Sequence, residues 1–219
     1  REIVGFSVLT CVQQSVMNFG ILMVQGLVNS FGPAVMAAFA AAVKIDAFAY
    51  MPVQDFGNAF STFIAQNYGA KQEGRIRAGL KGGAAAVVAF CLVVSILIWL
   101  FARPLMLLFV DAGETAIVAE GVRYLRIEGS FYWGIGCLFL LYGLYRALGR
   151  PGMSVVLTVI SLGTRVILAY LLSAVPLFGV TGIWWSVPIG WALADVTGLA
   201  YLKWKKADIL DSSKGRFAP

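Results

Sequence analysis

The chain has 219 residues, of which 60% are hydrophobic and 13% are charged, and its formal net charge is +6. Soluble domains have about 25% charged residues, so this composition excludes an ordinary globular protein and indicates segments that lie in a membrane. There is no histidine, which excludes histidine-ligated metal sites and histidine-based catalytic triads. The sequence also lacks a Walker-type phosphate loop and a GxSxG motif. We therefore expect no enzyme, no organic cofactor and no metal site.

The 41 residues from Ile3 to Val43 carry no charge. A helix needs about 20 apolar residues to cross a bilayer, so this run is long enough for two crossings. Gly32 and Pro33 interrupt the run, where a helix would break and turn. The sequence predicts a helical hairpin with helices over residues 4–30 and 35–65, and a bend at Pro52 in the second helix.

The rest of the chain has the same character. Its apolar runs are about 20 residues long and do not alternate with polar residues, which favours spanning helices over barrel strands. We predict four further helices over residues 83–102, 117–145, 153–175 and 182–202. The predicted fold is an all-α integral membrane protein, a six-helix transmembrane bundle over residues 1–206. A short polar cytoplasmic tail follows over residues 207–219.

The basic residues predict how the bundle is oriented. Cytoplasmic ends of membrane proteins are enriched in Lys and Arg, and Trp residues suit the membrane interface. The outward-side loops hold only Arg103, beside three acidic residues, and Trp184 and Trp185 are predicted to lie near an outer helix end. We predict a multi-pass protein of the plasma or inner membrane with both ends of the segment cytoplasmic, and the positive charge indicates topology and no nucleic-acid partner. Twelve of the 17 basic residues are predicted on the cytoplasmic side: Arg1, Lys71, Arg75, Arg77, Lys81, Arg146, Arg150, Lys203, Lys205, Lys206, Lys214 and Arg216.

Six charged residues from four predicted helices share one layer near the middle of the membrane. A charge at that depth costs at least about 2.5 kcal/mol if it faces lipid, so we expect these side chains to face inward. Two interpretations stay open: buried ion pairs that fix the helix packing, or the lining of a hydrated cavity for a substrate or a coupling ion. The six residues, three basic and three acidic, are Lys44, Asp46, Arg126, Glu128, Arg165 and Asp195.

Two orientations within this layer are specific predictions. Arg165 and Asp195 are predicted to pair between the last two helices. Lys44 and Asp46 are two residues apart and point about 200° apart around a helix, so they cannot face the same neighbour. We expect Asp46 to face a cleft, where a proton or a cationic substrate could bind, and Lys44 to face inward toward Glu128.

The first helix adds polar candidates. Asn18 and Gln25 are seven residues apart and share a helix face, and with Gln14 they could form a polar wall. Amide side chains in spans also commonly join helices, so both interpretations remain.

Three motifs carry a family resemblance. The segment FSTFIAQNYGAK at residues 60–71, YRALGRP at 145–151 and GIWW at 182–185 closely resemble helix eight, the loop after helix ten and the last helix of the multidrug and toxic compound extrusion (MATE) family. The resemblance implies one C-terminal six-helix lobe of a twelve-helix secondary antiporter, which exports amphipathic organic molecules or drugs in exchange for H⁺ or Na⁺. Its implied partners are membrane lipid, small organic substrates and a missing N-terminal lobe of a longer polypeptide.

The resemblance also bears on the coupling ion. Some family members have sodium-binding carboxylates on helices seven and ten, whereas the first predicted helix here has no acidic residue within the span and the fourth offers only Glu128. This departure leaves proton coupling through the other lobe, or through Asp46 or Glu128. Two alternatives are a lipid-linked oligosaccharide flippase of the same superfamily and a membrane scaffold that transports nothing. The balanced midplane charges weigh against the cationic cavity that a flippase would need.

Overall fold

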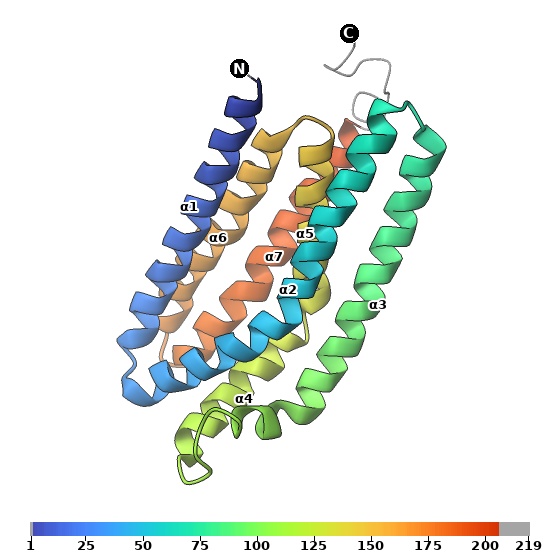
Figure 1. Ribbon diagram of the computed structural model, residues 1–219. Coiled ribbons are helices and arrows are strands. Elements are labelled where there is room, and N and C mark those ends of the chain that lie inside the picture. Colours follow the sequence, from blue (N-terminus) through green and yellow to red (C-terminus); the bar gives the residue numbers. More distant parts are fainter. Residues whose placement is uncertain (1, 206–219) are drawn as a thin grey trace.

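The computed structural model describes residues 2–205, which form a bundle of helices (Figure 1). The whole predicted tail, residues 207–219, lies outside the described residues, as do residues 1 and 206. The described part is all-α, as predicted, but it contains seven helices where the sequence predicted six. These are α1 (Glu2–Asn29), α2 (Pro33–Gly69), α3 (Glu73–Met106), α4 (Thr115–Gly129), α5 (Tyr132–Ala147), α6 (Pro151–Ser173) and α7 (Gly179–Trp204).

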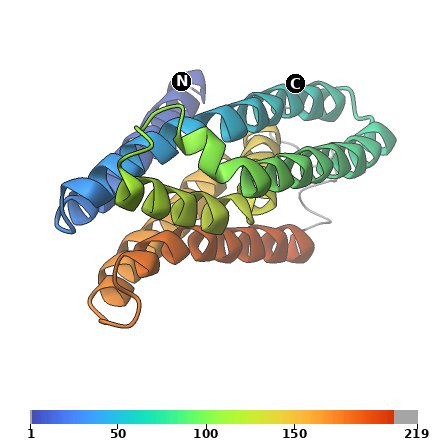
Figure 2. The same ribbon diagram turned by 90° about the horizontal axis from the view of Figure 1, so that it is seen from below.

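The extra helix arises because the predicted fourth span is broken. Helices α4 and α5 are together long and apolar enough for one membrane crossing, but they meet at a 51° bend. Four other helices in the described chain, α1, α2, α3 and α6, are long and apolar enough to cross a membrane, which makes five passes by composition. Helix α7 is not among these helices. It is nevertheless 26 residues long and runs alongside the others, as the sixth pass of the bundle (Figure 2).

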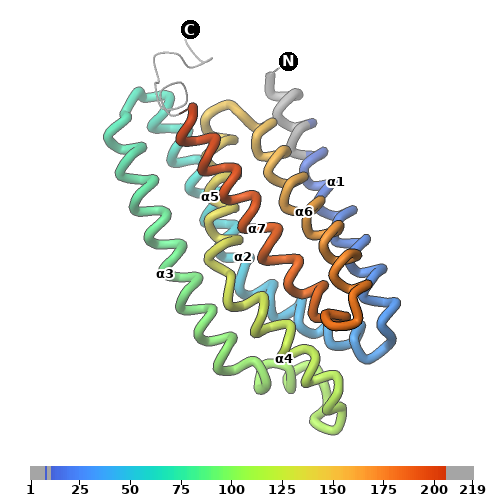
Figure 3. The backbone as a smooth tube through the Cα atoms, turned by 180° about the vertical axis from the view of Figure 1, so that it is seen from behind, coloured from blue at the N-terminus to red at the C-terminus, as the bar shows by residue number. Residues whose placement is uncertain are grey.

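The turns lie where the basic residues predicted them relative to one another. The beginning of α1, the α2–α3 turn, the α5–α6 turn and the end of α7 lie at one end of the bundle, whereas the α1–α2, α3–α4 and α6–α7 connections lie at the other end (Figures 1 and 3). We call the first of these ends the basic end. That the basic end is cytoplasmic stays a prediction.

The hairpin at the start of the chain forms where the sequence predicted it. Gly32 has a φ of 100°, a conformation that costs glycine little, and its N–H donates to the carbonyl of Asn29. Pro33 follows as the first residue of α2, a position at which its missing N–H would have no helical partner. Helix α2 then continues through Pro52 without a break, although the helix curves along its length (Figure 1).

Helix α3 differs most from its predicted bounds. The sequence predicted a helix over residues 83–102 with a basic loop before it, but α3 has 34 residues and begins at Glu73. Three of the four basic residues are therefore helical and only Lys71 lies in the turn. Arg77 lies 3.6 Å from Glu73 one turn earlier. Charged residues favour the exposed end of a helix as readily as a loop, so the drop in hydropathy there marked the edge of the apolar stretch and not the end of the helix.

Close helix packing sets the centre of the bundle. Helix α5 is the most enclosed element, with every residue from Leu138 to Tyr145 buried. A Cβ added to Gly143 would lie 2.5 Å from the carbonyl oxygen of Gly57, so α2 and α5 touch backbone to backbone. Small residues allow such contacts between membrane helices, where burial of apolar surface drives association less than packing does.

Candidate functional site

A buried carboxylate with two tyrosine partners lies where α2 passes the broken span. Asp46 on α2 is only 4% exposed. Tyr124 of α4 donates its hydroxyl hydrogen to one Asp46 oxygen at 2.6 Å, and Tyr132 of α5 donates to the other. Both oxygens of this buried group are therefore satisfied by side chains from two different helices, which is the arrangement that a carboxylate needs away from water.

A second carboxyl lies beside the first. Glu128 is 3% exposed and lies close enough to Asp46 and Tyr124 for its carboxyl to interact with both side chains. It sits in the last turn of α4, directly before the bend, and its carbonyl accepts the N–H of Phe131 across the break. The two carboxyls and the two tyrosines form what we call the carboxyl pair site: Asp46, Glu128, Tyr124 and Tyr132.

Sequence reasoning found the two acids of this site and missed the two tyrosines. Tyr124, Glu128 and Tyr132 follow one another at intervals of four residues, which places residues on one face of a helix. This spacing could have identified the two tyrosines as neighbours of Glu128. The contact of Tyr132 with Asp46 could not be predicted, because Tyr132 belongs to a new helix that begins after the break between α4 and α5.

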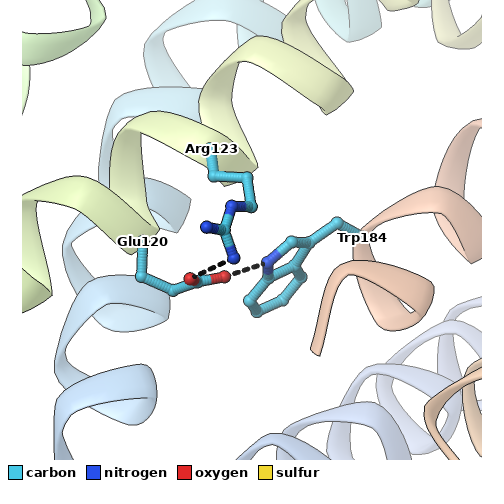
Figure 4. A network of polar contacts seen from close by, with 3 residues as sticks. All are labelled: Glu120, Arg123 and Trp184. Atoms are coloured by element: carbon cyan, nitrogen blue, oxygen red, sulfur yellow. Dashed lines mark hydrogen bonds and ion pairs between the residues drawn. The ribbon is translucent and has the colours of Figure 1, made fainter. Parts of the chain in front are cut away.

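An aromatic wall continues from the site toward α7. Tyr124 packs edge-on against Trp184 with ring centres 4.9 Å apart, and Phe39 stacks on the same indole at 5.6 Å. The indole N–H of Trp184 donates to Glu120 at 2.7 Å, and Arg123 donates to the other Glu120 oxygen at 3.0 Å (Figure 4). Trp184 is thus fully buried, which corrects its predicted place in an interfacial belt. Its neighbour Trp185 is the exposed one of the two.

The predicted orientations of Lys44 and Asp46 are reversed in the structure. Asp46 faces the interior beside Glu128, whereas Lys44 is exposed and its ammonium lies 5.9 Å from the ring centre of Phe109. Arg126 is also exposed, with its guanidinium 4.9 Å from the ring centre of Trp99. The long side chains of Lys and Arg reach outward along apolar surface, whereas the short side chain of Asp cannot, so the acid takes the interior position.

The predicted ion pair between Arg165 and Asp195 is absent from the described residues. Asp195 on α7 is 6% exposed, and neither of its oxygens has a hydrogen-bond partner. It faces α5, with one oxygen 3.8 Å from where a Cβ of Gly134 would lie. Arg165 on α6 is half-buried, acts electrostatically on Glu128 and leaves its Nε without a partner. The six charges of the predicted layer thus separate, and only Asp46 and Glu128 meet.

The three amide residues predicted to form a polar wall on α1 do not all come together. Gln14 donates to Asn18 at 3.4 Å, so these two side chains do share a face, and both are exposed. Gln25 is half-buried, with no hydrogen bond from its side chain among residues 2–205. The buried amide of this helix is Gln13, which donates to Thr158 of α6 at 2.9 Å and was not singled out from the sequence.

Comparison with known proteins supplies the family. The family model MatE matches residues 8–171. The chain belongs to the MATE family. The Bacillus subtilis protein named "Probable multidrug resistance protein YpnP" is 30% identical over 149 residues, which are 68% of this chain and 33% of that protein. "Probable multidrug resistance protein YoeA" of the same organism is 27% identical over 185 residues, 83% of this chain and 40% of that protein.

Solved MATE structures share the fold. A structure described as the outward-facing conformation of a multidrug resistance MATE transporter superimposes with a TM-score of 0.87 at 18% identity and covers 96% of this chain. The match spans 46% of that chain, so this MATE chain spans less than half the length of these proteins. The family resemblance of the three motifs is confirmed, and so is the all-α membrane bundle. The chain is accordingly a multi-pass membrane protein.

Proposed function

We propose that the chain forms one lobe of a secondary antiporter that exports amphipathic organic molecules, and that the carboxyl pair site binds the coupling proton. The observation that supports this proposal is the contact between Asp46 and Glu128 deep in the bundle. Two carboxyls in contact in an apolar site cannot both be ionised without a large cost, so such a pair holds a proton between them. Intramembrane acids of this kind form proton relays in transporters.

The position of the pair suggests how proton binding is coupled to movement. Asp46 and Glu128 come from α2 and α4, and Tyr132 begins α5 on the far side of the 51° bend. Loss or gain of a proton changes the repulsion between the two acids, and therefore the relative stability of different bend angles. Broken helices at membrane depth are where transporters place their ion sites.

A proton suits the site better than Na⁺. One proton shared by two carboxyls needs no further ligands, whereas a cation is usually held by several oxygens, and the described residues contain no group of three or more acidic, Cys or His side chains that could hold a metal ion. The partner lobe, the inner or plasma membrane as location, and a cytoplasmic basic end belong to the same proposal. They are supported by the fraction of each relative that the chain covers and by the placement of Lys and Arg.

The test is transport in proteoliposomes that contain the transporter to which this chain belongs. Ethidium efflux is measured under a pH gradient and, separately, under a Na⁺ gradient. We expect efflux under the pH gradient, and we expect Asp46→Asn and Glu128→Gln each to abolish it at unchanged protein level. Asp55→Asn is the matched control, because Asp55 lies on the same helix but is exposed. Efflux that persists in Asp46→Asn, or that needs Na⁺ alone, would contradict the proposal.

A further inference from the structure

A small polar cavity lies in the half of the bundle nearer the basic end, away from the carboxyl pair site. Helices α1 and α2 diverge from their shared turn (Figures 1 and 3). A cavity of about 60 Å³ is lined by residues of these two helices and of α5. We call it the Arg146 cavity. Its polar lining comes from all three helices: Gln13 and Gln14 on α1, Gln54 and Asn58 on α2, and Arg146 on α5.

The only charge that lines this cavity is positive. Arg146 donates from Nη2 to the side-chain oxygen of Asn58 at 2.9 Å and from Nε to the backbone carbonyl of Tyr142 at 3.3 Å. Both acceptors are neutral, and among the acidic residues whose side chains the structure describes none lies within 4.0 Å of this guanidinium. Asp55 follows the lining residue Gln54 in the sequence, but its side chain is exposed and does not line the cavity.

A guanidinium that is partly withdrawn from water and held only by neutral acceptors attracts an anion. Arg has five N–H donors in a fixed plane and matches the two oxygens of a carboxylate or phosphate group. Amide side chains on both sides add donors without adding a competing negative charge. The volume suits a single group of a few heavy atoms, and the exposed side chains of Gln14 and Asn58 leave the cavity open at the surface.

We infer that the Arg146 cavity binds one anionic group, a carboxylate, sulfonate or phosphate, of an amphipathic molecule that the transporter exports. This inference rests on the proposed export function and adds to its substrates molecules with an acidic group beside an apolar body. The apolar body is too large for this volume and lies outside the cavity, whose wall also includes the apolar side chains of Met17 and Phe139. The acidic group of the substrate then binds in the Arg146 cavity and the coupling proton binds in the carboxyl pair site, so neither has to displace the other.

The test is equilibrium binding of two dyes with similar ring systems and opposite charge, carboxyfluorescein and rhodamine 123, by fluorescence anisotropy. The purified transporter is reconstituted in neutral phosphatidylcholine nanodiscs. Because a charge-assisted contact is lost, we expect Arg146→Gln to weaken carboxyfluorescein binding about tenfold or more and to change rhodamine 123 binding by less than about twofold. Arg146→Lys should keep part of the affinity, because the charge remains.

Two further variants distinguish a loss of anion binding from a general folding defect. Gln54→Glu adds a negative charge to the cavity wall at a half-buried position without a side-chain hydrogen bond, and it should also abolish carboxyfluorescein binding. Arg150→Gln is the control: Arg150 is half-buried at the same end of the bundle, donates to Tyr201 at 3.0 Å and does not line the cavity. It should leave both dyes unaffected.

Three results would overturn the inference: carboxyfluorescein does not bind the unsubstituted protein, Arg146→Gln weakens both dyes alike, or Gln54→Glu leaves the anionic dye bound. Competition by phosphatidylglycerol through Arg146 would overturn the assignment to an exported molecule and point to a lipid headgroup. Anionic-dye binding that depends on Arg146 without any gradient-driven efflux would keep the cavity as an anion site and refute only the export function.

Discussion

At the scale of single residues, the length of a side chain decides which charges stay inside the bundle. Asp46 is buried, whereas Lys44, two residues earlier, reaches outward to the ring of Phe109. A long basic side chain can leave the apolar interior while its backbone stays at the same depth, whereas a short acid needs partners where it stands. The tyrosine hydroxyls that solvate Asp46 are therefore as important to the site as the acids themselves.

We expect Tyr132→Phe to destabilise the protein by about 1–3 kcal/mol, because it removes one hydrogen bond from a buried carboxyl and leaves the other atoms in place. Thermal unfolding in detergent measures the effect. In an Asp46→Asn background the same change should cost less, since the acceptor is altered. Tyr170→Phe is the control, because Tyr170 is exposed on α6 and its hydroxyl has no hydrogen bond in the described structure. Equal costs in the two backgrounds would show that Tyr132 does not act through Asp46.

Arg165 and Asp195 should behave as independent residues. Since the structure shows no contact between them, the costs of Arg165→Gln and Asp195→Asn in a thermal-unfolding cycle should add to within about 0.5 kcal/mol. Asp195→Asn alone should cost little or stabilise, because it replaces a buried carboxyl that lacks partners with a neutral group of the same shape. Recovery in the double variant, as the sequence-based pairing predicted, would show that the two side chains do pair.

At the scale of helices, backbone contact decides which pairs are fixed and which can move. Helices α2 and α5 touch at Gly57 and Gly143, and α6 and α7 touch at Gly190, where an added Cβ would lie 2.5 Å from the carbonyl oxygen of Ser161. The bend between α4 and α5 lies about three helical turns before Gly143 and is not part of these contacts. We therefore regard the bend as the movable joint of the lobe and the glycine contacts as its fixed points.

Gly143→Ala should destabilise the protein by about 1–3 kcal/mol, because the new methyl group cannot fit against the α2 backbone without separating the helices. Gly163→Ala is the control on α6, where an added Cβ meets nothing within 4 Å. That substitution should be neutral or stabilise by up to about 1 kcal/mol through helix propensity. Detergent melts of both variants measure the contrast, and equal melting temperatures would rule out the close contact.

At the scale of the whole molecule, the bundle has two chemically different regions. The carboxyl pair site is acidic and fully enclosed, and the Arg146 cavity is basic and open, nearer the basic end. When the exported molecule carries an acidic group, the transporter needs a place for that anion and a separate place for the coupling proton. One lobe contains candidates for both.

The orientation of the lobe can be tested by cysteine labelling in right-side-out and inverted vesicles. In a variant without the native cysteines, we expect Gln72→Cys, in the α2–α3 turn, to react only in inverted vesicles. Gly113→Cys, in the α3–α4 connection at the opposite end, should react only in right-side-out vesicles. The excess of Lys and Arg at the basic end is the physical reason. The reverse labelling pattern would invert the topology, and labelling of both sites from one side would contradict the arrangement of the turns.

The sequence alone determined the fold class, the first hairpin, the relative side of each turn and the family. Each of these depends on properties that act along the chain: apolar length against bilayer thickness, Gly32 and Pro33 at a break, basic residues at helix ends, and contiguous motifs. The sequence also identified Asp46 and Glu128 as candidates, because an acidic side chain at that depth is costly unless it has partners or a function. The break at Ser130 and Phe131 was not predicted, although Gly129 and Ser130 lie directly at it and Gly/Ser pairs are sites where helices bend.

Only the tertiary structure decided which charges meet. Depth in a membrane follows from position along a helix, but contact depends on how each helix is rotated, and rotation is set by packing among all its neighbours. For this reason Asp46 meets Glu128 while Asp195 and Arg165 remain apart, and Arg146 comes to line a cavity with residues of α1 and α2 more than 80 positions away. Periodicity places residues on faces; the glycine contacts between helices decide which faces meet.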